Sequence, residues 1–486
     1  MYTFSSRLKT FSFILIVLGI LGVGYSFFTA PQTVEDVERI LAEEEHGHGG
    51  HHDGAEHYDD GITLGEGNHT THELHNIEDS HDNASGHAIH DDIDHKENIN
   101  KHTTKSPSLH EVHEVDEHHE HLEHVLHQLQ NKPWAAVYIA ALFFMLISLG
   151  ALAFYAIQNA AQAGWSPVLF RVMEGISSYL VPGAIIVYVL LVLGVMDIHH
   201  LFIWMDEKVV ANDHLIQGKS GYLNGPFFLI RAAIFMGGWI LYRQYATRNS
   251  LRQDDAHDNL YYKKNFKASA GFLVFFIITE SIMSWDWIMS VDPHWYSTLF
   301  GWYVFASFFV SGITAIALVT VYLKGKGYLE YVNTSHIHDL AKFMFGISIF
   351  WTYLWFSQFM LIWYADIPEE VTYYITRIEQ YNLPFFGMVA MNFLFPVLIL
   401  INTDFKRLSW IIVMAGIVIL CGHYIDFFNM IMPATVGDRW FIGAGEIGAI
   451  MLFLGLFILV VFTALTKAPL LAKRNPLIEE SKHFHY

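Results

Sequence analysis

The sequence has almost no cysteine and none of the short motifs that hold redox centres or nucleotides. Its one cysteine, Cys421, excludes an internal disulfide, a four-cysteine iron–sulfur cluster and a CxxCH haem attachment. No Walker A loop or GxGxxG fingerprint opens a helix. We therefore expect no haem, iron–sulfur cluster or resident metal in this chain. Any electron chemistry would need a diffusible cofactor or a partner subunit.

Charge is also scarce, and it is concentrated in one segment. Only 16% of the 486 residues are charged, whereas 53% are apolar, a balance that soluble domains rarely have. Residues 31–132 contain 25 acidic and 5 basic side chains, which accounts for the whole net charge of −20. The acidity therefore belongs to one local segment, and we expect no nucleic-acid partner.

Long apolar runs fill the remainder of the chain. A bilayer core about 30 Å thick needs roughly 20 apolar residues per helix. The sequence thus predicts an all-α polytopic membrane protein with ten transmembrane helices. These spans lie near 10–30, 134–158, 175–197, 225–247, 268–289, 297–323, 341–365, 384–402, 408–430 and 445–467. Because residues 25–30 form a poor cleavage site, the first run is interpreted as a retained N-terminal anchor over 1–30.

Basic residues predict how the chain is oriented. Lys and Arg gather in alternate loops, which places both termini in the cytoplasm and residues 31–132 in the periplasm of a Gram-negative cell. Residues 31–132 also hold 20 of the 30 histidines. The stretch 46–106 lacks apolar periodicity, which predicts disorder, whereas residues 109–129 have the spacing of a short amphipathic helix. This segment could capture metal ions weakly, or it could be a solvated acidic loop, which is the favoured reading.

Ionisable residues inside the predicted spans are candidates for function, because burying them in a membrane is costly. Glu280 and Asp286 could pass protons toward the outer surface. His423 and Asp426 are one helical turn apart, so they could transfer a proton or simply form a satisfied buried pair. Arg231 could pair with one of the acids, or extend its charged end to the interface.

Four aspartates recur at the outer ends of alternate spans: Asp197, Asp286, Asp366 and Asp426. The recurrence suggests an internal repeat, of a kind common in transporters. Spans 2–5 and 6–9 would then form two four-helix bundles, over 133–290 and 291–430. The first and last spans would flank them, and residues 431–486 would hold the last helix and a cytoplasmic tail. Four acids at helix ends could also be chance.

Residues 285–301, WDWIMSVDPHWYSTLFG, resemble the signature of the NrfD/PsrC-like integral membrane subunits of alternative complex III. Within that family the chain is most similar to the second such subunit, ActF, over about 134–467. The long His-rich insert departs from the family pattern. The resemblance implies two four-helix bundles and two peripheral helices in the bacterial inner membrane. It also implies a subunit of a quinol:cytochrome c or quinol:oxidase oxidoreductase that is not catalytic alone.

Further expectations follow from this resemblance. The partners would be a paralogous NrfD-like subunit, an iron–sulfur subunit, multihaem and monohaem cytochrome c subunits, and a terminal oxidase. A menaquinol or other quinone would bind without a covalent link. The candidate quinol contacts are Asp286, Asp292, His294, Trp285 and Arg231, and the candidate proton-transfer groups are Glu280, Asp286, His423 and Asp426. The tryptophans near 285–302 could instead form an interfacial belt.

Two other classes of function stay open. A metal or ion transporter could use the His-rich loop, but it would need ligand pairs deep in the spans, and His423 with Asp426 is the one such pair. A purely structural membrane anchor would need no bound quinone.

Overall fold

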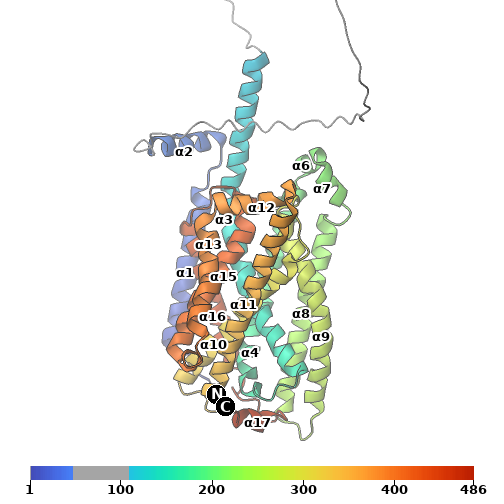
Figure 1. The fold of residues 1–486 in the computed structure, drawn as a ribbon, viewed down its shortest axis with the longest axis vertical. Coiled ribbons are helices and arrows are strands. Elements are labelled where there is room, and N and C mark those ends of the chain that lie inside the picture. Colours follow the sequence, from blue (N-terminus) through green and yellow to red (C-terminus); the bar gives the residue numbers. More distant parts are fainter. Residues whose placement is uncertain (1, 48–108, 486) are drawn as a thin grey trace, which may run out of the picture. The chain divides into compact units, whose positions relative to one another are not determined.

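A computed structural model describes residues 2–47 and 109–485 (Figure 1). Within these residues every regular element is helical, and ten helical stretches are long and apolar enough to cross a membrane. They are Ser6–Thr29, His121–Ala160, Pro167–Val195, Gly225–Gln253, Leu260–Val291, Phe300–Gly325, Thr334–Ala365, Asn382–Leu400, Ser409–Val436 and Ala444–Leu465. The prediction of an all-α polytopic membrane protein is confirmed. The predicted disorder of 46–106 falls almost wholly outside the described residues.

The α-helices are α1 (Ser6–Thr29), α2 (Val34–Gly47), α3 (Leu109–Ala160), α4 (Phe170–Ile176), α5 (Leu180–Val195), α6 (Glu207–Asn212), α7 (His214–Lys219), α8 (Gly225–Gln253), α9 (Leu260–Trp287), α10 (Phe300–Gly325), α11 (Thr334–Ala365), α12 (Pro368–Glu379), α13 (Asn382–Val389), α14 (Phe395–Leu400), α15 (Ser409–Val436), α16 (Ala444–Leu465) and α17 (Ile478–Lys482). Short turns of 3₁₀-helix are η1 (Pro167–Leu169), η2 (Ser177–Tyr179), η3 (Ile203–Met205), η4 (Met289–Val291) and η6 (Phe405–Arg407). A π-helical turn, η5 (Ala390–Leu394), joins α13 to α14.

Helices α3 and α10 form the centre of the bundle. In their most apolar stretches 94% and 83% of the residues are buried, whereas the corresponding share in α1 is 17%. The two helices cross at Gly150 and Gly312. A Cβ on Gly150 would lie 2.5 Å from the Phe308 carbonyl oxygen, and one on Gly312 would lie 2.6 Å from the Ala151 nitrogen. Glycine is therefore needed for this close backbone approach.

Residues 109–129 do not form the separate short helix that the spacing predicted. They are the first part of α3, which continues without a break into the second span and contains Pro133. Proline is expected to mark a helix boundary because it lacks an N–H, but here the helical register is kept on both sides of it. Asn131, one turn after Gln128, exchanges two hydrogen bonds with the backbone of His200.

The two predicted halves pack into one body. Of the described residues, 2–34 and 123–485 form a single compact unit, and 35–47 and 109–122 belong to a second one. Within the first unit α8 packs on α5 and α9, α10 packs on α11 and α15, and the contact of α9 with α10 joins the halves. Helices α1 and α16 lie side by side at the edge of the unit, and Gly22 and Gly448 let their backbones approach closely (Figure 1).

Equivalent positions of the two halves share local geometry. Asp197 follows α5 and Asp366 follows α11, and both adopt a left-handed backbone, with φ of 61° and 50°. Aspartate tolerates this conformation better than most residues do, so both act as helix ends. Asp286 and Asp426 are each followed, seven residues later, by a proline, Pro293 and Pro433 respectively. The fourfold recurrence of aspartate thus divides into two helix-ending residues and two buried ones.

Both chain termini lie at one end of the bundle, called here the terminal end (Figure 1). The Tyr2 ring contacts the Tyr328 ring at 5.0 Å, and Asn333 donates a hydrogen bond to the Phe484 carbonyl at 2.6 Å. Helices α6, α7 and α12 lie at the opposite end. Large apolar side chains are exposed around the surface between the two ends, as lipid contact requires: Ile230, Ile234, Leu241, Val274, Ile277 and Ile278 among them.

Candidate functional site

A group of polar side chains is completely buried between α10, α11, η5 and α15. We call it the His423 cluster, and its members are Tyr303, Ser307, Trp351, Asn392, His423 and Asp426. Each is at most 4% exposed. Buried polar groups need partners, so this cluster must either be satisfied internally or have a chemical task.

Asp426 is held by donors from two other helices. The Tyr303 hydroxyl donates to Oδ1, and the Trp351 indole donates to Oδ2 at 2.8 Å. His423 Nδ1 lies 3.5 Å from the same Oδ2. The structure therefore brings together the His423–Asp426 pair that the sequence indicated. It also adds Tyr303 and Trp351, which sequence reasoning did not include.

The His423 ring has polar groups on one side only. Its Nδ1 lies 3.0 Å from the Ser307 hydroxyl and 3.4 Å from the Asn392 amide nitrogen. Its Nε2 is buried and has no hydrogen-bond partner among the described residues. An imidazole with one anchored and one open nitrogen can accept a proton on one side and release it on the other.

A break in the eighth span places Asn392 beside His423. Pro396 has no N–H to donate to the Asn392 carbonyl four residues earlier, so that helical hydrogen bond is missing. The chain instead forms the π-helical turn Ala390–Leu394, and such turns are frequent at functional sites. Asn392 Oδ1 is buried without a partner. An asparagine four residues before a proline in an apolar run was the available sequence signal.

A row of hydroxyl groups extends along α10 from the His423 cluster. Tyr303, Ser307, Ser311 and Thr314 are spaced by four, four and three residues, so they share one helix face, and all are buried. Ser311 donates to the Ser307 carbonyl at 2.8 Å, and the Thr314 hydroxyl has no partner among the described atoms. This row was also missed from the sequence, although its helical spacing was visible.

A cavity of about 10 Å³ adjoins Tyr303, and this is room for about one water molecule. Gln358 and Asn429 line it, and each has a buried side-chain oxygen without a partner. The cavity also contacts Arg377, whose guanidinium lies 3.3 Å from the Tyr373 ring centroid and donates to the Asn429 carbonyl. Polar groups thus continue beyond Asp426 toward α12.

Glu280 on α9 is a buried acid with an incomplete set of partners. It is 4% exposed, its Oε1 accepts a hydrogen bond from Ser281 at 2.8 Å, and its Oε2 has no partner among the described residues. Ser281 packs against α10 at Gly301, where an added Cβ would lie 3.1 Å from the Ser281 Cα. Glu280 Oε2 can therefore accept a proton, whereas the oxygens of a salt-bridged acid are occupied by the cation.

Asp286 is fully occupied by contrast. Arg231 Nε donates to its Oδ2 at 2.6 Å and Nη2 donates to its Oδ1 at 3.1 Å, and the Tyr222 hydroxyl donates to Oδ1 at 2.8 Å. The Arg231 guanidinium lies over the Tyr222 ring at 4.0 Å. Arg231 is buried, so it pairs with Asp286 rather than extending to the interface. The pairing of Arg231 with one of the acids is thus observed.

The remaining predicted quinol contacts take no part in that salt bridge. His294 Nε2 lies 2.5 Å from Asp213 Oδ2, and Lys219 donates to the Pro293 carbonyl. Burial lowers the pKa of Lys219, while the charge of Asp292 acts in the opposite direction. His294 and Asp292 therefore join the α9–α10 loop to the loop that carries α6 and α7. Trp285 is half-buried, and its indole nitrogen has no partner among the described residues.

The fold and these clusters define the chain as a multi-pass, all-α membrane protein with buried acids in both halves of its bundle. The sequence matches no protein-family model and has no match among curated proteins.

Proposed function

We propose that this chain is an integral membrane subunit of a quinol:cytochrome c or quinol:oxidase oxidoreductase complex in the bacterial inner membrane. Its own contribution is proton conduction, with the His423 cluster and Glu280 as the groups that carry protons. The single observation behind this proposal is the buried His423 ring. It is anchored through Nδ1 near Asp426 and Ser307, and its Nε2 is open.

The hydroxyl row on α10 and the cavity beside Tyr303 support the same proposal. Proton transfer needs groups that both donate and accept, and hydroxyls, imidazole, carboxylate and water all do so. Ser311 extends the cluster from Ser307 along α10, and the cavity with Gln358 and Asn429 adjoins the cluster at Tyr303. Together they form a polar series inside a membrane helix bundle, where such groups are otherwise costly.

Oxidation of one quinol releases two electrons and two protons. Glu280 can accept a proton through its open Oε2, and Ser281 holds the other oxygen. The electrons go to a partner, because the single cysteine cannot hold an iron–sulfur cluster and no CxxCH haem attachment is present. The proposed partners are an iron–sulfur subunit, the cytochrome c subunits, a paralogous membrane subunit and a terminal oxidase. The quinone itself is a non-covalent ligand.

The proposed orientation places the terminal end in the cytoplasm. The helix ends, loops and tail at that end contain Lys263, Lys264, Lys324, Lys326, Lys473 and Arg474, in agreement with the excess of basic residues on the cytoplasmic side. Residues 31–132 would then be periplasmic, as would Asp286 and the loops carrying α6, α7 and α12.

One observation favours a second candidate, a structural subunit without proton transfer. Asp286 accepts three hydrogen bonds from Arg231 and Tyr222, so it joins α8 and α9 and has no open oxygen for a quinol hydroxyl. We accordingly assign Asp286 and Arg231 a structural role and leave proton transfer to Glu280 and His423.

Purification of the chain from its native membrane under mild detergent tests the proposal. Haem spectra and quinone extraction of the purified material should reveal c-type haems in partner subunits and a bound quinone. Isolation of the chain alone, with metal or ion flux in reconstituted vesicles, would contradict the proposal and favour the transporter. Isolation with haem subunits but without quinone, and with quinol turnover insensitive to Glu280→Gln and His423→Asn, would favour the structural subunit.

A further inference from the structure

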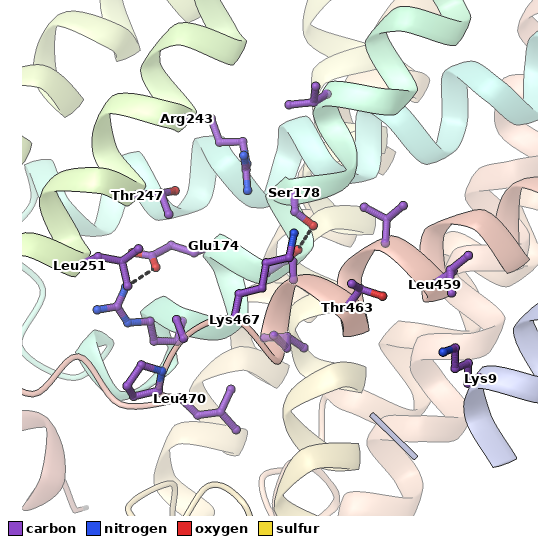
Figure 2. A pocket seen from close by; sticks show the side chains of 18 residues that line it. Lys9, Glu174, Ser178, Arg243, Thr247, Leu251, Leu459, Thr463, Lys467 and Leu470 are labelled. Atoms are coloured by element: carbon purple, nitrogen blue, oxygen red, sulfur yellow. Dashed lines mark hydrogen bonds and ion pairs between the residues drawn. The ribbon is translucent and has the colours of Figure 1, made fainter. Parts of the chain in front are cut away.

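A cavity of about 740 Å³ opens at the terminal end between α1, α4, α5, α8 and the end of α16. Its lining combines basic side chains with an apolar wall (Figure 2). The proton-carrying groups proposed above do not line it.

The basic residues outnumber the acids in this cavity. Lys9, Arg171, Arg243 and Lys467 line it together with a single carboxylate, Glu174. Arg171 is already occupied, because it donates to Glu174 at 2.7 Å and to Asp254 at 2.6 Å. With Asp254 included, four basic side chains face two carboxylates, so this group keeps a net charge of +2.

The other three basic residues form no salt bridge among the residues that the structure describes. Arg243 Nε is buried without a hydrogen-bond partner, and Lys9 and Lys467 form no ion pair with any described residue. In Figure 2 the side chains of Arg243 and Lys467 point into the cavity from opposite sides, with Ser178 between them and Lys9 farther along. Arg243 is half-buried and so favours an anion beside it, and the exposed Lys9 and Lys467 add positive charge to the same cavity.

The lining changes from charged to apolar along the helices. Lys9 lies at the end of the first turn of α1 and Lys467 lies just past the end of α16, so both are at the ends of apolar helices. Farther from the end of α16 the wall consists of Leu459 and Val460, with Val181 of α5 facing the same space. A cationic rim above an apolar groove matches an anionic headgroup above an acyl chain.

We infer that this cavity binds an anionic phospholipid, with its phosphate between Arg243 and Lys467 and an acyl chain along Val181, Leu459 and Val460. Lys9 adds attraction at the rim. Free phosphate offers the same charge but cannot use the apolar wall. Zwitterionic lipid can use the wall but brings a positive group to a site that is already cationic. The site therefore selects for charge and acyl chain together.

Native mass spectrometry of the complete purified assembly, delipidated and titrated with phosphatidylglycerol or phosphatidylcholine, tests this inference. The variants are Arg243→Gln, Lys467→Gln and the double variant. Lys263→Gln is the matched control, because Lys263 is an exposed cation at the same end outside the cavity. Each removed charge should weaken phosphatidylglycerol binding about fivefold, and the double variant about 25-fold, with Lys263→Gln unchanged.

Three results would overturn the inference. They are equal affinity for the two lipids, displacement of phosphatidylglycerol by millimolar inorganic phosphate, and unchanged binding by the double variant. Lys467 is exposed, so Lys467→Gln keeps the fold even if the double variant does not, and its fivefold effect is decisive alone.

Discussion

At the scale of single residues, the two buried aspartates of the spans have different partners and hence different roles. Asp286 is neutralised by a fixed cation, Arg231, whereas Asp426 is held by neutral donors, Tyr303 and Trp351, beside an imidazole. A fixed ion pair stabilises a helix contact. Neutral donors next to an open imidazole nitrogen permit a proton to move. The same residue type thus forms an ion pair in one half, and in the other half it belongs to the cluster that we propose to transfer protons.

Replacing Arg231 with glutamine tests the structural role of the Asp286 salt bridge. The substitution leaves Asp286 buried without its cation, which typically costs about 3–5 kcal/mol in unfolding free energy. Thermal unfolding of the purified protein in detergent should show a large decrease in Tm. The double variant Arg231→Gln with Asp286→Asn should recover part of the loss, because no uncompensated charge remains. An unchanged Tm in the single variant would contradict the assigned role.

The residue types in the candidate site were predictable from the sequence, but their partners were not. His423 and Asp426 were recognisable because charged residues are rare in apolar runs and these two are one helical turn apart. Tyr303 and Trp351 resemble ordinary apolar or interfacial residues, and they become site residues only because α10 packs against both α11 and α15. Asp286 forms a salt bridge and Glu280 does not, because Arg231 lies beside Asp286. Arg231 is 55 residues from Asp286 in the sequence, and hydrophobic periodicity cannot predict such a contact.

At the scale of elements, two glycines allow the central helices α3 and α10 to pack closely. Gly150 on α3 and Gly312 on α10 allow a backbone approach that any side chain would prevent. Gly150→Ala should therefore lower the unfolding free energy by at least about 1–3 kcal/mol, since an added methyl group overpacks the crossing. Gly346→Ala on α11 is the matched control, because nothing lies within 4 Å of its added Cβ. Equal stability of the two variants in a denaturant titration would contradict the crossing.

The short helix α7 depends on one capping acid. The hydrogen bond from the Ile216 backbone N–H, followed by the one from His294, lowers the pKa of Asp213. The pKa of Asp213 in the folded protein therefore lies below its unfolded value of about 4. Ionised Asp213 therefore stabilises α7 fully above its unfolded pKa, and this stabilisation is lost as the pH falls through its folded pKa. Hydrogen-exchange protection of α7, corrected for intrinsic rates, should fall as the pH is lowered below about 4. In Asp213→Asn the protection should no longer depend on pH in that range; constant protection in the wild type would be contrary to this reasoning.

The positions of the spans were predictable, because apolar length alone identifies them. Interruptions within them were not. The third span consists of η1, α4, η2 and α5, and the eighth is interrupted by the π-helical turn. Helix α2 was also unforeseen within the acidic segment, although Val34, Val37, Ile40 and Leu41 have helical spacing. The many charged residues of this segment made the short apolar stripe difficult to recognise in the sequence.

At the scale of the whole molecule, the account requires a defined orientation in the membrane. Cysteine labelling can test it, because the chain has one natural cysteine. In a Cys421→Ala background, an impermeant maleimide added to intact spheroplasts should label Ser220→Cys and leave Lys326→Cys unlabelled until the membrane is opened. Both positions are exposed and lie at opposite ends of the bundle. The reverse pattern would invert the proposed direction of proton release.

The central claim, that the chain conducts protons for quinol oxidation, is tested most directly by quinol turnover of the native complex carrying His423→Asn. The account predicts a loss of about 100-fold, the usual contribution of one acid–base group, with haem spectra and Tm unchanged. The control, His214→Asn, alters an exposed histidine outside the spans and should keep full turnover. Turnover by His423→Asn at the wild-type rate would contradict the account.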